Sequence, residues 1–350
     1  MQQLTGWLIF VLSCIGQAEL WVMMVNRSYA FAVDCTHLRK FRALHDFAIV
    51  AYPFWLLWSC GLGTHGLLTG GSFTDQTLFW RVILVGTLLA TIPFFAGILR
   101  WQWVRRFQFH KSNGGEVFDV AAIAKDDATL ADVKGSRWHP VLAWPWNEVF
   151  SLEVNRKTIR VANPGESSRT PLRIAHFSDL HFINCPGADY YRFVVRKVLE
   201  LNADAIVFTG DLIDEPELLQ TAIEILRPLT NVAPCFFVLG NHDWRYDYEM
   251  FRSGVAASGW QCVTGTHVTI PLADRKVLFA GSERPWIGDP PPSAVDADVD
   301  VRILLSHSPD QYRVAQKCGY DVMLSGHTHG GQFVLPIIGP VYAPSIHGVS

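Results

Sequence analysis

The chain has 350 residues, of which 49% are hydrophobic, and a formal net charge of -3 at pH 7. This length allows one sizeable domain and an additional segment. The small net charge and the absence of a long basic run give no support for binding to nucleic acid. The seven cysteines are scattered and form no C-x-x-C pair, which argues against a disulfide framework and favours a reducing compartment.

Most of the apolar excess lies before residue 100, in three runs that approach the ~20 apolar residues needed to cross a bilayer as a helix. We predict three membrane spans, from Leu4 to Val25, from Phe47 to Leu68 and from Phe79 to Leu99. The alternative is that all three are buried core helices. Lys and Arg residues lie between the first two runs and after the third, but the loop between the second and third has none. The positive-inside rule therefore predicts a multi-pass protein of the cell membrane whose soluble part is cytoplasmic.

Residues 112–146 have a mixed composition and are interpreted as a linker between a membrane region, residues 1–111, and a soluble domain, residues 147–350. The linker tryptophans either extend a belt at the membrane surface or pack on the soluble domain. They are Trp138, Trp144 and Trp146. From Phe150 to Val161, apolar residues alternate on either side of Asn155-Arg156-Lys157, which predicts a β-hairpin at the start of the soluble domain.

The rest of the chain alternates between short apolar runs typical of buried strands and segments with helical spacing. The predicted strands are Leu172 to His176, Ala205 to Thr209, Cys235 to Leu239, Val277 to Ala280, Ile303 to Leu305 and Val322 to Leu324. The predicted helices are Asp189 to Leu201 and Pro216 to Leu229. This alternation predicts an α/β layered domain.

Five polar clusters follow predicted strands, at the point where the loops of such sheets collect ligands. They are Asp179-Leu180-His181, Gly210-Asp211, Gly240-Asn241-His242-Asp243, Ser306-His307 and Gly326-His327-Thr328-His329. Burying so many unpaired polar groups would be costly without a shared partner such as a metal. The clusters offer enough oxygen and imidazole ligands for two divalent metals that share one carboxylate. These candidate ligands are Asp179, His181, Asp211, Asn241, His307, His327 and His329.

In this order, the clusters resemble the motifs of the calcineurin-like metallophosphoesterase superfamily, and the match runs from about Leu172 to Gln332. The string Gly326-His327-Thr328-His329-Gly330-Gly331-Gln332 is similar to that of bacterial membrane-associated members. The resemblance implies a layered β-sandwich flanked by helices, here preceded by transmembrane helices. It also implies a metal-dependent phosphoric ester hydrolase.

The resemblance further implies which residues hold each metal. One metal would be held by Asp179, His181, Asp211 and His329, and the other by Asp211, Asn241, His307 and His327, so that Asp211 bridges the two. His242 would act on the phosphate as a catalytic residue. Asp214 is either the acid that orients His242 or a charge at the start of the helix that follows. Manganese is the expected metal, with iron and zinc as alternatives that the ligand types also suit.

Two functions follow from this interpretation. The first is a membrane-anchored phosphoesterase that hydrolyses a phosphodiester or pyrophosphate, with a lipid-linked substrate such as UDP-diacylglucosamine by analogy with bacterial membrane-tethered relatives. The second is a catalytically weak membrane scaffold or sensor that retains a structural metal site. Relatives usually continue past the last motif with strands that complete a second sheet, whereas this chain stops at Ser350. We therefore expect either a differently closed sheet edge or a shortened form.

Overall fold

The computed structural model describes residues 2–28, 31, 35–107, 115–119, 147–161, 170–184, 186–295, 298–331, 334–335, 337–340 and 343–346. The chain divides into two compact units. We call the first the helical unit; it contains Met1–Lys111 together with Gly330–Ser350. We call the second the sandwich unit; it contains Ser112–His329.

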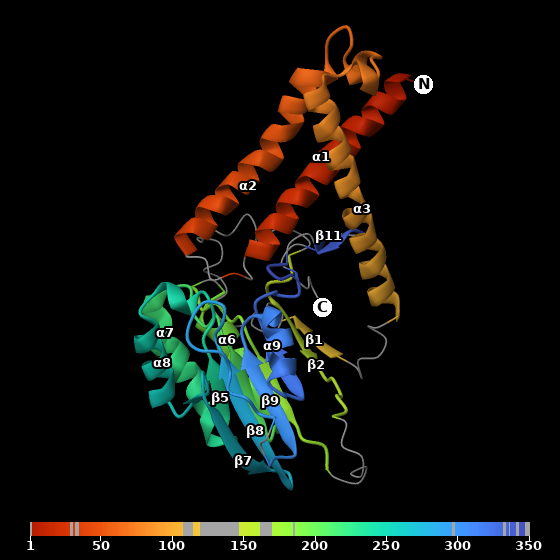
Figure 1. Ribbon diagram of the computed structural model, residues 1–350. Coiled ribbons are helices and arrows are strands. Elements are labelled where there is room, and N and C mark those ends of the chain that lie inside the picture. The colour runs from red at the N-terminus through yellow and green to blue at the C-terminus, as the bar shows by residue number, and fades with distance from the viewer. Residues whose placement is uncertain are drawn as a thin grey trace. The chain divides into compact units, whose positions relative to one another are not determined.

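The helical unit is built from three long helices, α1 (Gln2–Ser28), α2 (Cys35–Leu56) and α3 (Leu78–Phe107), which Figure 1 shows in red and orange. Helix α2 continues as a π-helical turn, Leu57–Gly61, and two 3-10 turns, Leu67–Thr69 and Phe73–Asp75, lead into α3. A small apolar cluster holds the helices together. It contains Tyr52, Leu56, Cys60, Leu67, Trp80 and Leu84, with Ile9, Phe10 and Cys14 of α1 packed against it.

Close backbone approach and hydrogen bonds complete the packing of the helices. A Cβ atom at Gly16 would lie 1.8 Å from the carbonyl oxygen of Thr87, so glycine is required where α1 meets α3. The buried Ser13 hydroxyl is hydrogen-bonded to both the Tyr52 and the Thr87 hydroxyls, at 2.7 Å each. Each helix thus has a polar contact with another helix, which satisfies hydroxyl groups that lipid could not.

Two helices among the described residues, Gln2–Ser28 and Leu78–Trp103, are long and apolar enough to cross a membrane. The predicted second span, Phe47 to Leu68, is wrong in its bounds, because helical structure begins at Cys35 and ends at Gly61. The first half of this helix is charged, and carries Arg39, Lys40, Arg42 and Asp46. The apolar run therefore marks only the second half of a helix whose beginning is polar.

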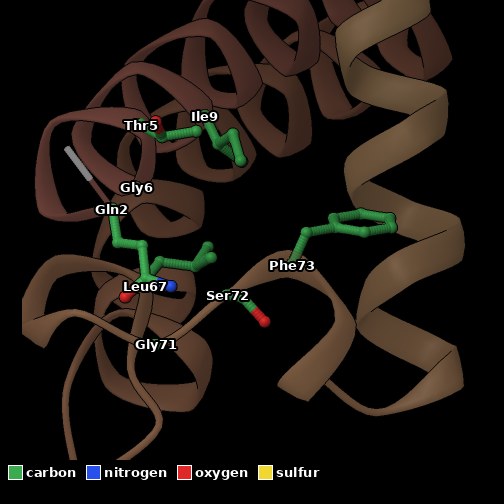
Figure 2. Close-up of a pocket in the computed structure, with 8 residues that line it drawn as sticks. All are labelled: Gln2, Thr5, Gly6, Ile9, Leu67, Gly71, Ser72 and Phe73. Carbon is green, nitrogen blue, oxygen red and sulfur yellow. The ribbon is translucent and has the colours of Figure 1, made fainter.

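The helical unit also contains a cavity and a short C-terminal hairpin. The cavity, of about 190 Å³, is lined by residues of α1 and of the 67–73 segment (Figure 2), and none of its lining residues is Asp, Glu, Lys, Arg, His or Cys. We assign it no chemistry. In the hairpin, β11 (Val334–Leu335) pairs antiparallel with β12 (Gly339–Pro340).

The sandwich unit contains two four-stranded sheets. In the first, β3 (Ile174–Phe177), β4 (Ala205–Thr209), β5 (Cys235–Val238) and β6 (Gln261–Cys262) are all parallel. The second has the order β10-β9-β8-β7, with β10 (Val322–Ser325), β9 (Val301–Ser306) and β8 (Arg275–Ser282) parallel and β7 (His267–Leu272) antiparallel to β8.

The two faces of each central strand belong to different cores. In β4, Ala205 and Val207 join the apolar core between the sheets, together with residues of β5, β8 and β9. Ile206 and Phe208 instead pack toward the helices α6 (Ala188–Glu200), α7 (Leu219–Leu226) and α8 (Tyr248–Ala257). Helix α9 (Tyr312–Lys317) contributes Ala315 to a third cluster on the outer face of the second sheet. The predicted α/β sandwich flanked by helices is confirmed.

One local prediction in this unit is wrong. The segment 150–161 does not form a hairpin with itself, since only β2 (Ser151–Asn155) is a strand and residues 156–161 are not. Its partner is β1 (Gly115–Asp119), in an antiparallel pair from Gly115↔Asn155 to Asp119↔Ser151. Strand β1 lies within the segment that was predicted to be a linker. The alternation in β2 identifies a strand but not its pairing partner, so the sequence did not reveal this pair. Trp138, Trp144 and Trp146 lie outside the described residues.

Candidate metal centre

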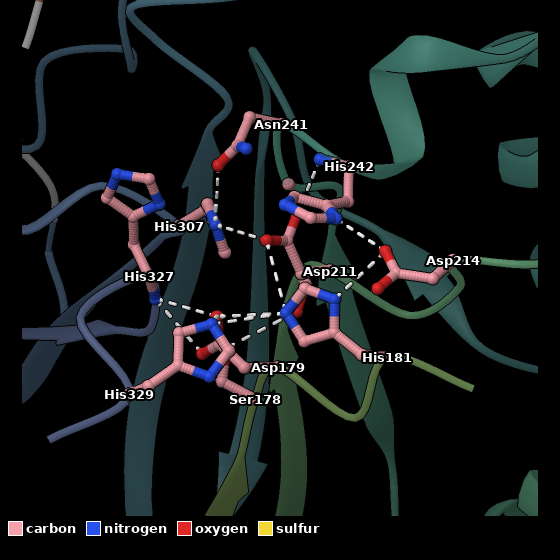
Figure 3. Close-up of polar contacts among 12 residues, drawn as sticks. Ser178, Asp179, His181, Asp211, Asp214, Asn241, His242, His307, His327 and His329 are labelled. Carbon is pink, nitrogen blue, oxygen red and sulfur yellow. Dashed lines mark hydrogen bonds and ion pairs between the residues drawn. The ribbon is translucent and has the colours of Figure 1, made fainter. Parts of the chain in front are cut away.

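The candidate ligands lie at the carboxyl ends of five strands that come from both sheets. Asp179 and His181 follow β3, Asp211 follows β4, and Asn241 follows β5. His307 follows β9, and His327 and His329 follow β10. Because parallel strands place their carboxyl ends at the same edge, the two sheets bring these loops to one place (Figure 3).

Backbone hydrogen bonds join these loops into one structure. The backbone N–H of Asp179 donates to the Gly210 carbonyl at 2.9 Å, and that of His181 donates to the Asp211 carbonyl at 3.0 Å. The backbone N–H of His327 donates to the Asp179 carboxylate at 3.0 Å. The loops therefore fix one another, and each ligand position depends on its neighbours.

Five candidate ligands have left-handed backbone conformations, which side-chain-bearing residues rarely adopt. Their φ angles lie between 43° and 75°, and they are Asp179, His181, Asp211, His327 and His329. Each such residue costs of the order of 1–3 kcal/mol and persists only where its surroundings hold it in place. The strain is therefore concentrated at the candidate ligands, which is typical of a functional site.

The first group of ligand atoms is partly exposed and contains Asp179, His181, Asp211 and His329, whose ligand atoms all lie within 4.8 Å of one another. The Nε2 atoms of His181 and His329 are 3.2 Å apart. His329 Nε2 is 3.4 Å from Asp179 Oδ1, and His181 Nε2 is 3.6 Å from Asp211 Oδ2. Two imidazole nitrogens and two carboxylates that converge in this way suit a divalent cation.

The second group is buried and contains Asp211, His307 and His327. His307 Nδ1 donates a hydrogen bond to the Thr209 carbonyl at 2.7 Å, which directs its Nε2 into the centre. This Nε2 atom is 3.1 Å from Asn241 Oδ1 and 3.2 Å from Asp211 Oδ2. Asn241 therefore joins the group through its amide oxygen, and Asp211 belongs to both groups.

The charges of the centre favour a proton on His307, at a position where a metal would bind. Burial opposes a charge on His307, but the Asp211 carboxylate outweighs it and raises the pKa of His307 to about 9. Burial likewise favours neutral Asp211, but His307 and the neighbouring histidines hold the pKa of Asp211 well below its usual value. His307 Nε2 faces two oxygen acceptors, so a proton there occupies the position that a metal would take. The donor set thus fits a cation.

His242 and Asp214 form a separate polar pair beside the first group. Asp214 Oδ1 accepts from His181 Nδ1 at 3.1 Å and also from His242 Nδ1. These histidines hold the pKa of Asp214 below its usual value, although burial acts in the opposite direction. Asp214 therefore orients two imidazoles, and in each it leaves Nε2 available for other contacts. Arg245 Nη2 lies 3.0 Å from His242 Nε2.

Asp243, to which the sequence motif gives no role, organises the loops from within. Its buried carboxylate accepts hydrogen bonds from the backbone N–H groups of Asp211 and Gly240 at 2.9 Å each, and from that of Leu212 at 2.8 Å. Burial and the Asp211 charge raise the pKa of Asp243 to about 7. Its position next to His242 in the motif was the one available signal of this role.

A second buried carboxylate, Glu283, supports the loop that carries Asn241 and His242. Glu283 Oε1 accepts from the Leu239 backbone N–H at 2.7 Å, just before that loop. Glu283 Oε2 forms a 2.6 Å ion pair with Arg252 of α8. No sequence motif identified this pair, because its partners lie 31 residues apart.

The structure thus brings together all seven candidate ligands, with His242 and Asp214 beside them (Figure 3). Their separate roles as ligands, bridge or catalyst stay predictions. Arg245 and Trp286, whose ring lies 5.0 Å from that of His327, are additional members of the site that the motifs did not include.

Residues 172–331 match the family model described as calcineurin-like phosphoesterase. An uncharacterized metallophosphoesterase of Bacillus subtilis, YkuE, is 33% identical over 49% of this chain and 63% of its own length. The phosphodiesterase YaeI of Escherichia coli is 29% identical over 51% of this chain and 68% of its own length. The UDP-2,3-diacylglucosamine pyrophosphatase LpxG of Chlamydia trachomatis is 27% identical over 56% of this chain and 76% of its own length. The chain therefore spans somewhat under two thirds of the first of these relatives.

Proposed function

We propose that this chain is a membrane-anchored phosphoesterase that uses two divalent metals to hydrolyse a phosphodiester or pyrophosphate, and the match of residues 172–331 to the calcineurin-like phosphoesterase model supports this. One observation carries the proposal. Two groups of oxygen and nitrogen ligand atoms, each within 4.8 Å, share the Asp211 carboxylate. A shared carboxylate between two ligand sets is what a binuclear site requires.

In this proposal, Asp179, His181, Asp211 and His329 hold one metal, and Asp211, Asn241, His307 and His327 hold the other. Two bound metals polarise phosphate oxygens and lower the pKa of a water molecule toward neutrality. Family members use divalent metals, and the ligand types suit manganese, with iron and zinc as alternatives.

His242 acts on the leaving group in this proposal. Its Nδ1 is held by Asp214, so its Nε2 is the atom that contacts substrate. In this proposal, Nε2 passes a proton to the leaving oxygen after the Arg245 guanidinium, which donates a hydrogen bond to Nε2 in the structure, turns to the phosphate. Arg245, 3.0 Å from this Nε2, adds a positive charge where a phosphate oxygen would bind.

Hydrolysis of bis(p-nitrophenyl) phosphate by the purified full-length protein with Mn²⁺ tests the activity. We expect Asp211→Ala to lose both metals and turnover, because both ligand groups depend on this residue. His242→Ala should retain its metals but turn over about 100-fold more slowly. His267→Ala, which changes an exposed histidine outside the site, is the control and should match the parent. Parent turnover no faster than that of His242→Ala, with metals bound, would refute the enzyme and leave the scaffold or sensor as the function.

We also propose that the helical unit lies in the cell membrane and that the sandwich unit is cytoplasmic. Two helices of suitable length and hydropathy support this location. Tyr52 of α2 and Cys60 of the π-helical turn that follows it pack near the beginnings of α1 and α3, which directs the charged first half of α2 toward the opposite end of the unit. Arg27 and Arg100 lie at that same end, which the positive-inside rule makes cytoplasmic.

Reporter fusions test this orientation. A fusion after Lys111 should report a cytoplasmic position, and an insertion between Gly70 and Thr74 should report an external one. An external signal after Lys111 would overturn the orientation and the compartment together.

A lipid-linked substrate is the most specific part of the proposal. A tethered enzyme meets an amphiphilic substrate by diffusion within the membrane, and a relative, LpxG of Chlamydia trachomatis, is described as a UDP-2,3-diacylglucosamine pyrophosphatase. We expect kcat/KM with a lipid-linked pyrophosphate in micelles to exceed that with a water-soluble analogue of the same headgroup. Equal values would remove the lipid substrate but leave the phosphoesterase.

A further inference from the structure

The C-terminal hairpin, which follows the site in the sequence, carries exposed apolar side chains among its described residues. From Gly330 to Ile346 the sequence contains no Asp, Glu, Lys or Arg. The exposed fractions are 74% for Ile337 at the hairpin turn, 52% for Val334 and 47% for Leu335. Exposed aliphatic side chains grouped on one short element are typical of a surface that contacts another apolar phase.

The hairpin packs on one end of a helix that can cross the membrane. Gln102 Nε2 donates a hydrogen bond to the Ile337 carbonyl at 2.6 Å. A Cβ atom at Gly339 would lie 2.6 Å from the Trp101 ring, so this ring packs directly on the hairpin backbone. Trp101 and Gln102 belong to the last turn of the Leu78–Trp103 apolar segment. Their depth in the membrane therefore sets the depth of the hairpin.

That depth is the boundary between lipid and water. If Leu78–Trp103 crosses the bilayer, its end with Trp101 and Trp103 lies at the headgroup level, where Trp residues are enriched. The exposed aliphatic side chains of a hairpin fixed there face the outer part of the acyl region. We propose that residues 334–340 form a membrane-interface anchor, whose occupant is the bilayer surface. The proposal rests on the membrane location given above for α3.

The anchor has a consequence for the substrate. Val334 follows His329 by five residues, and five residues of fully extended chain reach at most about 18 Å. With Val334 at the membrane surface, the length of this link sets an upper limit on the distance between His329 and the headgroups, whatever the placement of the sandwich unit. A phosphate or pyrophosphate group attached to lipid lies at this level.

Photocrosslinking in phosphatidylglycerol and phosphatidylethanolamine nanodiscs tests the anchor without using activity. The photoreactive residue p-benzoylphenylalanine replaces Ile337 in the full-length protein, and lipid adducts are counted by mass spectrometry. Two matched exposed sites serve as controls: Leu89 in the middle of α3 and Val232 in the sandwich unit, both 59% exposed. We expect adducts at position 337 to be about tenfold more frequent than at position 232 and comparable to those at position 89.

The controls separate the two proposals. Lipid adducts at position 89 but not at position 337 would overturn the anchor and leave the membrane location intact. Lipid adducts at neither position would refute the membrane location. Crosslinks from position 337 to a segment of the chain other than α3, or to a second copy, would show that protein covers the hairpin and would also overturn the anchor.

A functional measurement adds a second, independent outcome. The substitution Ile337→Asp places a charge at the level of the acyl chains and should lower kcat/KM for a lipid-linked pyrophosphate by about tenfold relative to a soluble analogue. Ile337→Leu keeps the aliphatic character and should restore the parent ratio. An unchanged ratio in the Asp variant would overturn the role of the anchor in substrate access.

Discussion

Metal binding should become tighter as the pH rises, because the metal must displace a proton from His307. Without metal, the pKa of His307 is raised to about 9 by the Asp211 carboxylate, so this side chain carries its second proton at pH 7. A metal ligand needs the free Nε2 lone pair, and binding therefore releases this proton. Below pH 9, each unit of pH should change the apparent Kd for Mn²⁺ about tenfold through this residue alone.

The magnitude is large enough to measure. Between pH 6 and pH 8 the apparent Kd should fall about 100-fold, and the proton costs about 3 kcal/mol of binding free energy at pH 7. Because the pKa of His181 is also raised, by carboxylates that outweigh its burial, part of a second proton should be released from the first ligand group. At low pH, the number of protons released on metal binding should therefore exceed one.

Calorimetric titration of the metal-free protein with Mn²⁺, in two buffers of different ionisation enthalpy, counts the protons released. His307→Gln is the control, since it removes the proton while keeping a polar side chain at the position. This variant should bind more weakly at every pH and should release about one proton fewer at pH 7. If the parent and this variant release equal numbers of protons, the assignment of the proton to His307 is wrong.

Two further predictions concern the loops around the centre. Arg252→Met should lower the free energy of unfolding by about 3–5 kcal/mol, because it leaves Glu283 buried without its charge partner. The control Arg192→Met, at an exposed ion pair, should lower it by under about 1 kcal/mol. Equal shifts in thermal unfolding for the two variants would contradict the prediction. Gly240→Ala should lower the bound metal content, because its Cβ atom would lie 2.1 Å from the shared Asp211 carboxylate. In the control Gly254→Ala, the nearest atom to the new Cβ is a flexible side-chain methyl at 3.1 Å, and this variant should retain its metals. Equal metal contents in the two variants would contradict the steric reasoning.

The strands and the order of the site motifs could be predicted because each has a local signal. The run Ala205 to Thr209 has the bounds of β4, since a strand buried on both faces is apolar throughout. The ligands could be placed together because parallel strands end at one edge. These predictions use only neighbouring residues and one general property of sheets.

The features that could not be predicted depend on partners that are distant in the sequence. Strand β2 shows its alternation locally, but its pairing with β1 joins Ser151 to Asp119. The Glu283–Arg252 pair likewise depends on the position of α8 relative to the end of β8. The charged start of α2 was lost from the predicted span because a hydropathy pattern measures transfer to lipid and not the extent of a helix.

The left-handed backbone at five of the candidate ligands has a consequence for protein engineering. Glycine tolerates this conformation better than any other residue, so glycine at these positions would relieve local backbone strain and remove a ligand at the same time. Selection of variants for thermal stability in the absence of metal would therefore favour substitutions that destroy the site. A stabilised version of this protein should be sought with metal present during selection, when each intact ligand contributes to the stability of the folded chain.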